Sequence, residues 1–140
     1  MIRRLSSRAL LAVIALIGAG MAAAMASGSP GLPRAMTPAL PGLWDVSHSA
    51  DGKNAERVCL PDPSMLAQWE HRSGRCTRVV IEDSGTKAVI QYTCADGGFG
   101  RSDLTLLTPR TLRIATQGIS QSYPFAYTLH ARRVGDCPTH

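Results

Sequence analysis

The sequence lacks any closely spaced pair of redox or metal-binding residues. Its four histidines and four cysteines include no C-x-x-C, H-x-x-x-H or H-E-x-x-H arrangement, and such spacings are typical of thiol redox motifs and zinc sites. A nucleophile elbow of the form G-x-S-x-G is missing, and the dispersed acidic residues argue against a glycosidase-like carboxylate pair. We therefore expect no catalytic residue, no cofactor and no metal. The alternative is an enzyme site assembled only by folding, around His48 or His130.

A strong net charge is also lacking once residues 1–26 are set aside. The sequence has 15 basic and 10 acidic residues, but Arg3, Arg4 and Arg8 lie at its start, which leaves 12 basic against 10 acidic residues, a net charge of +2. This balance gives no support to a nucleic-acid partner or a membrane-surface role. Some arginines nevertheless lie close together and could line a site for an anion or a lipid headgroup. They are Arg72, Arg75 and Arg78; Arg110 and Arg113; and Arg132 and Arg133.

Residues 1–26 have the three parts of a secretory signal peptide. Residues 1–8 are positively charged, residues 9–23 are apolar, and Ala24-Met25-Ala26 supplies the small-x-small pattern that precedes cleavage. We expect cleavage after Ala26, which predicts a periplasmic or secreted protein. The alternative is a leader that stays attached as a membrane anchor, because its apolar stretch approaches membrane-spanning length.

The rest of the chain predicts a linker and one small domain. Residues 27–41 contain four prolines and predict an extended linker, and residues 42–140 have room for one modest core. Alternating apolar and polar residues predict strands, and we place them at 43–49, 56–60, on either side of a turn at 83–86 within 75–94, at 103–107, at 111–116 and at 125–131. The Gly-rich residues 94–100 and the polar residues 118–123 read as loops.

One helix interrupts the strands. Asp62 can cap it, Pro63 suits its first position, and Ser73-Gly74 ends it. The predicted fold class is therefore mainly β: a curved antiparallel meander sheet or partly open barrel, with one short helix covering an opening and two disulfides stapling the domain.

The hairpin within residues 75–94 carries a register signal. If Ser84 and Gly85 form a two-residue loop, Glu82 faces Lys87, and polar and apolar residues match on both faces of the hairpin. A slip of one residue would mix polar with apolar partners, so we prefer the first register.

The four cysteines of an exported chain predict two structural disulfides. In the preferred register, Cys76 opposes Thr93 and points away from Cys94, which excludes a bridge between these two cysteines. We favour Cys59 with Cys76, closing the loop around the helix, and Cys94 with Cys137, tying the tail to the hairpin. The other connectivity, Cys59 with Cys94 and Cys76 with Cys137, stays open.

Several short motifs occur in a fixed order along the predicted domain. They are Gly42-Leu43-Trp44-Asp45-Val46, Cys59-Leu60-Pro61, Tyr92-Thr93-Cys94, and the segment from Arg132 to Pro138 that reads RRVGDCP. With them, the chain resembles a family of small exported bacterial proteins catalogued as domain of unknown function 3617. The resemblance covers residues 42–138 and implies a proteobacterial periplasmic setting and structural cysteines. It implies no activity and no catalytic residues.

We therefore expect a non-enzymatic binding or interaction module in the periplasm. The predicted curved sheet offers a concave apolar face, and nothing in the sequence assembles a catalytic constellation. Its partner would be a periplasmic ligand or protein, and the sequence leaves the oligomeric state open. A hydrolase-like enzyme and a structural envelope protein are the alternatives.

Overall fold

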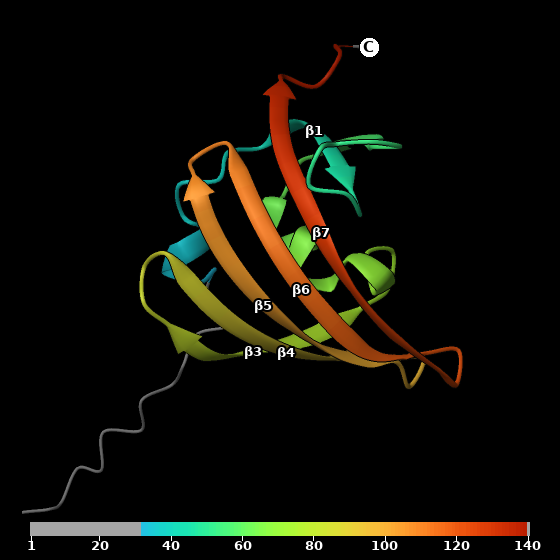
Figure 1. Ribbon diagram of the computed structural model, residues 1–140. Coiled ribbons are helices and arrows are strands. Elements are labelled where there is room, and N and C mark those ends of the chain that lie inside the picture. The colour runs from blue at the N-terminus through green and yellow to red at the C-terminus, as the bar shows by residue number, and fades with distance from the viewer. Residues whose placement is uncertain (1–31, 140) are drawn as a thin grey trace, which may run out of the picture.

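Seven antiparallel strands form one strongly curved sheet. The computed structural model describes residues 32–139, and the strand order is β2-β1-β7-β6-β5-β4-β3. The strands are β1 (Gly42–Ser47), β2 (Glu56–Leu60), β3 (Cys76–Asp83), β4 (Lys87–Cys94), β5 (Phe99–Thr108), β6 (Thr111–Ser120) and β7 (Tyr123–Gly135). The sheet curls around the helical segments and leaves β2 and β3 as its two edges (Figure 1). The prediction of a curved, mainly β fold is confirmed.

The helical segment η2 (Pro63–His71) packs against the concave face of the sheet. It begins as predicted, because Asp62 accepts a hydrogen bond from the backbone N–H of Ser64 at 2.9 Å and Pro63 takes the first position. It is a 3₁₀ helix with a kink at Gln68 rather than a regular α-helix. Within residues 32–139, no helix is long and apolar enough to cross a bilayer.

The folded domain begins before residue 42. A short 3₁₀ segment, η1 (Arg34–Met36), lies in the stretch expected to be a linker. Ala35 and Met36 are fully buried, and Ala39 is nearly so. The prolines of this stretch do interrupt periodic structure, but its apolar side chains still fill part of the core. Residues 33–41 are therefore part of the domain.

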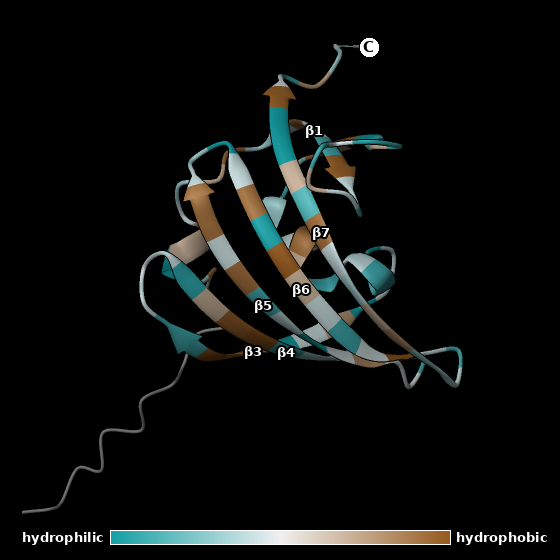
Figure 2. Ribbon diagram, in the orientation of Figure 1, coloured by the Kyte–Doolittle hydropathy of each residue, from teal (hydrophilic) through white to brown (hydrophobic). Residues whose placement is uncertain are grey.

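The hydrophobic core lies between the concave face and the two helical segments. Figure 2 shows hydrophobic and hydrophilic bands alternating along β5, β6 and β7, as expected of strands with one buried face. The largest fully buried apolar side chains on the sheet are Trp44, Leu60, Ile90, Tyr92, Leu104, Leu112, Ile114 and Leu129, and η1 and η2 add Met36 and Leu66. Removing this apolar surface from water is the main force that holds the sheet in its curved form.

A buried polar contact joins η2 to the middle of the sheet. Ser102, on β5, has no exposed surface, and its Oγ donates to the carbonyl oxygen of Ala67 at 2.6 Å. The same oxygen lies 2.9 Å from Oγ1 of Thr116 on β6. Both buried hydroxyls are thereby paired, which such groups require inside a protein.

The register of the β3–β4 hairpin corrects our prediction. Glu82 pairs with Val89 and Asp83 with Ala88, so four residues rather than two lie between the last paired residues at the turn. A bulge between Val80 and Glu82 then shifts the pairing by one position, and Arg78 pairs with Tyr92, an arrangement that the pattern of polar and apolar residues disfavoured. The guanidinium compensates by donating from Nη1 to the carbonyl oxygen of Ser64 on η2 at 2.9 Å.

The same shift corrects the disulfide pairing. Cys76 lies directly opposite Cys94 on the neighbouring strand, and the two are bonded. The second bridge joins Cys59 on β2 to Cys137 beyond β7. The favoured pairs, Cys59 with Cys76 and Cys94 with Cys137, are wrong because they rested on a two-residue turn and a hairpin without a bulge.

The loop predicted at residues 118–123 is shorter than expected. Strand β6 extends to Ser120 and β7 begins at Tyr123, so only Gln121 and Ser122 remain between them. Both have positive φ angles, 49° and 68°, as a type I′ hairpin turn requires. Residues 118–123 therefore form a tight hairpin end.

Replacing Cys59 and Cys137 with serine should destabilise the domain more than replacing Cys76 and Cys94. The first bridge joins residues 78 positions apart and the second joins residues 18 positions apart. A longer closed loop removes more entropy from the unfolded chain, and the difference in free energy of unfolding is about 1 kcal/mol. Urea denaturation of the two double variants measures it, and a larger loss from the shorter loop would contradict this prediction.

Candidate functional site

Three arginines that are close in the sequence line one hollow of the surface. Arg72, Arg75 and Arg78 border a groove of about 810 Å³, which we call the arginine groove. Its other walls come from η2 through Met65 and Gln68, from Gly74, and from the ends of β3 and β4 through residues 76–77 and 93–95. None of these lining residues carries a carboxylate. The groove therefore presents positive charge without a compensating acid in its wall.

Two of the three guanidinium groups are held in place by the protein. The Arg72 guanidinium carbon lies 4.2 Å from the centre of the Trp69 ring, a cation–π contact. Its Nη2 also donates to Glu56 Oε1 at 2.9 Å. Arg78 is fixed by its bond to Ser64. Within residues 32–139, Arg75 is exposed and has no ion pair or side-chain hydrogen bond. A guanidinium carries five donors, so N–H groups remain for a ligand.

The other predicted arginine groups do not form such a surface. Arg113 and Arg132 border a second hollow of about 620 Å³, but Asp45 and Asp51 border it too. Arg133 is mostly buried and donates from Nε to the carbonyl oxygen of Pro41 at 2.9 Å. The second hollow therefore has mixed charge, and it offers an anion less than the arginine groove does.

Asp45, one of the two carboxylates in the second hollow, already has an arginine partner. Asp45 accepts two hydrogen bonds from Arg57, at 2.7 and 2.9 Å. These bonds hold the pKa of the Asp45 carboxyl below its usual value. The carboxylate thus forms an ion pair with Arg57 across β1 and β2.

His48 and His130, the two histidines considered for catalysis, have different surroundings. The exposed ring of His48 packs edge-on against Tyr127, with the ring centres 4.8 Å apart. His130 borders the second hollow beside Asp45 and Asp51. Among the residues that the structure describes, no hydrogen bond joins His130 to either carboxylate. The geometry gives this histidine no acid–base partner.

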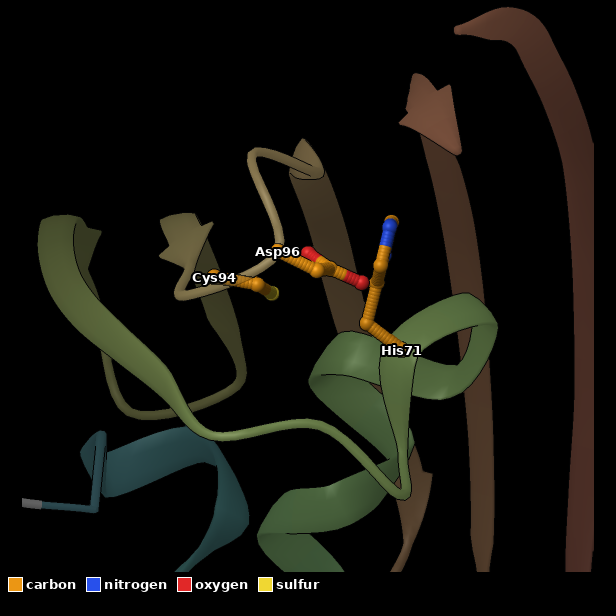
Figure 3. Close-up of side chains that lie close together, drawn as sticks. All are labelled: His71, Cys94 and Asp96. Carbon is orange, nitrogen blue, oxygen red and sulfur yellow. The ribbon is translucent and has the colours of Figure 1, made fainter. Parts of the chain in front are cut away.

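A third histidine, which sequence reasoning did not single out, is the buried one. His71 ends η2 and is 6% exposed. Its Nδ1 lies 3.3 Å from the Tyr92 hydroxyl, whereas its Nε2 is buried without a hydrogen-bond partner. Three side chains near this atom could bind a metal ion: His71, Cys94 and Asp96. Each offers one ligand atom, and these atoms lie within 4.8 Å of one another (Figure 3). Because Cys94 is in a disulfide, only His71 and Asp96 can act as strong ligands in this state.

The Gly-rich stretch after β4 forms a tight turn against His71. The Cys94 N–H donates to the carbonyl oxygen of Gly98 at 2.7 Å, and the Gly98 N–H donates to Asp96 Oδ1 at 2.9 Å. A Cβ on Gly98 would lie 2.2 Å from His71 Nε2. Glycine is therefore required at position 98 for close packing, and the stretch leads into a strand rather than into a helix.

The buried Tyr92 and the half-buried Tyr127 stay protonated beside η2. Burial raises the pKa of Tyr92 to about 12, although a hydrogen bond with Thr116 opposes the rise. Burial and the nearby Glu70 raise the pKa of Tyr127, whose hydroxyl donates to Glu70 Oε2 at 2.9 Å. Both phenols therefore serve as neutral partners in the packing of η2 against the sheet.

Comparison with protein families matches most of this domain. The family model described as "Protein of unknown function (DUF3617)" matches residues 39–137. The chain belongs to the DUF3617 family. The match covers all seven strands, both pairs of bonded cysteines and the arginine groove of this DUF3617 domain. No curated protein and no solved structure matches the chain.

Replacing Gly98 with alanine should destabilise the DUF3617 domain by about 1–3 kcal/mol, because the added methyl group overlaps His71. Gly135→Ala is the matched control, since a Cβ there meets no atom within 4 Å. Thermal unfolding of both variants tests the difference. If Gly98→Ala were as stable as Gly135→Ala, the turn would not be packed against the histidine.

Proposed function

We propose that this chain is an exported, non-enzymatic binding module that takes an anionic ligand in the arginine groove. The observation that carries the proposal is that three arginines line one hollow, none of whose lining residues carries a carboxylate. Guanidinium groups bind carboxylates and phosphates through paired, charge-assisted hydrogen bonds. The ligand class is therefore a small molecule that carries carboxylate or phosphate groups.

The anchoring of two arginines supports this proposal. Arg72 stacks on Trp69, and Arg78 is bonded to η2. A side chain that is already held in place loses less conformational entropy when a ligand binds. The exposed Arg75 adds a third cation at the rim. The volume of the groove, about 810 Å³, lies in the usual range for small-molecule sites.

The cysteines support export. The structure has two disulfides, and the part of the chain that it describes has no free cysteine. Disulfides are typical of proteins in an oxidising compartment. The predicted signal peptide, residues 1–26, lies outside the described residues. We infer a periplasmic or secreted location from the two observations together.

The arginine groove can be tested with simple polyanions. We expect pyrophosphate or citrate to bind the purified mature protein, and Arg75→Ala to weaken binding by about tenfold, because one charge-assisted contact is lost. Arg110→Ala, at an exposed turn between β5 and β6, is the matched control and should bind like the wild type. Isothermal titration calorimetry at low and high salt measures both effects.

Two results would contradict the groove as a binding site. One is the absence of binding of both anions to the wild-type protein at low salt. The other is an equal loss of affinity in Arg75→Ala and Arg110→Ala, which would mean that net charge rather than the groove attracts the anion.

The intact mass of the exported protein tests the location. We expect a species that lacks residues 1–26 and that takes up alkylating reagent at four cysteines only after reduction. A mature protein that retains its leader would instead support the membrane-anchored alternative.

A further inference from the structure

The buried Nε2 atom of His71 has no partner in the structure. A polar atom in such a position lowers stability unless a donor, an acceptor or an ion pairs with it. The atom lies under the turn of residues 94–98, where the Asp96 side chain extends toward the histidine (Figure 3). His71 is thus a buried member of a cluster with one missing interaction.

Two sulfur atoms lie beside this cluster. Cys94 belongs to it, and Cys76 is bonded to Cys94. Three ligand atoms therefore lie together, and the disulfide brings a fourth, Cys76 Sγ, which lies 3.9 Å from the carbonyl oxygen of His71. They come from η2, β3, β4 and the turn after β4, so the fold and not the sequence spacing brings them together.

We propose that reduction of the Cys76–Cys94 disulfide creates a site for a zinc-type divalent cation, bound by both cysteine sulfurs, His71 and Asp96. The inference does not depend on anion binding in the arginine groove. Nitrogen, sulfur and carboxylate oxygen are the ligands of tetrahedral zinc sites, and four such ligands close the coordination shell.

The ligand atoms must move closer together to hold such an ion. Zinc lies about 2.0–2.3 Å from its ligand atoms, so the ligand atoms of a tetrahedral site are about 3.3–3.8 Å apart. The cluster spans up to 4.8 Å while Cys94 is held by its disulfide. Opening the bridge frees the Cys94 side chain to rotate toward His71. The Tyr92 hydroxyl beside Nδ1 would then orient the ring.

The chemistry balances with a trialkylphosphine as reductant. The phosphine gives two electrons to the disulfide and is oxidised to the phosphine oxide, with its oxygen taken from water. The two protons of that water go to the sulfurs of Cys76 and Cys94. Binding of the divalent cation then displaces both thiol protons to solvent. Cys76 is only partly buried and borders the arginine groove, which gives the reductant a path to the bridge.

Cobalt(II) is the probe, because its visible spectrum reports tetrahedral geometry and thiolate ligands. We expect the phosphine-reduced mature protein to bind one equivalent with intense tetrahedral bands, to release it to zinc, and to retain its β-sheet circular dichroism. The oxidised protein should show no such bands. Replacing His71 with asparagine should weaken binding by at least about tenfold through loss of one ligand.

The two cysteine pairs supply the matched control. A variant with Cys59→Ser and Cys137→Ser keeps the four proposed ligands and should bind cobalt after reduction, whereas a variant with Cys76→Ser and Cys94→Ser should not. If the variant with Cys59→Ser and Cys137→Ser fails to fold, the comparison of reduced with oxidised wild-type protein still tests the proposal. The proposal is overturned if the reduced wild type gives no tetrahedral spectrum, if the spectrum appears only with loss of the β-sheet signal, or if the Cys76/Cys94 variant or His71→Asn binds cobalt as the wild type does.

Discussion

The packing of η2 into the concave face of the sheet is the constraint on which the other features depend. The sheet has two edges and does not close on itself, so its inner apolar face must be covered by something other than strands. Leu66 and Ala67 of η2 have no exposed surface, and the Ser102 hydroxyl fixes the segment to β5. The outer side of the same segment forms one wall of the arginine groove. Its last residue, His71, lies under the turn after β4.

Much of the fold can be predicted from the sequence because local chemistry decides it. Alternation along β1 and β7 reflects one buried face, and Asp62-Pro63 marks the start of η2 because both residues suit that position in isolation. The approximate hairpin is also predictable from Ser84-Gly85. The four-residue turn and the bulge in β3 are not, because the pattern of polar and apolar residues favours a two-residue loop with an unbroken ladder. The predicted disulfide pairing is wrong for the same reason.

The two candidate sites also differ in how far the sequence predicts them. Arg72, Arg75 and Arg78 lie within one short stretch, so their shared place on the surface could be anticipated, although the absence of a carboxylate from the groove lining could not. His71 is a different case, because Cys94 and Asp96 reach it only through the curvature of the sheet. A single histidine at the end of a helix resembles any structural histidine. The one local sign was the pair Gly97-Gly98, which indicates a close approach of the backbone without saying to what.

The bulge in β3 has a consequence for the protein at high concentration. An exposed edge strand with apolar residues can template a strand from another molecule, the first step toward aggregation. Strand β3 is such an edge and exposes Val79 and Ile81. A bulge bends a strand and increases its local twist, so the free N–H and C=O groups of β3 do not form the straight row that an added strand would need. The irregularity that redirects Cys76 toward Cys94 thus also protects an open sheet from growing by strand addition.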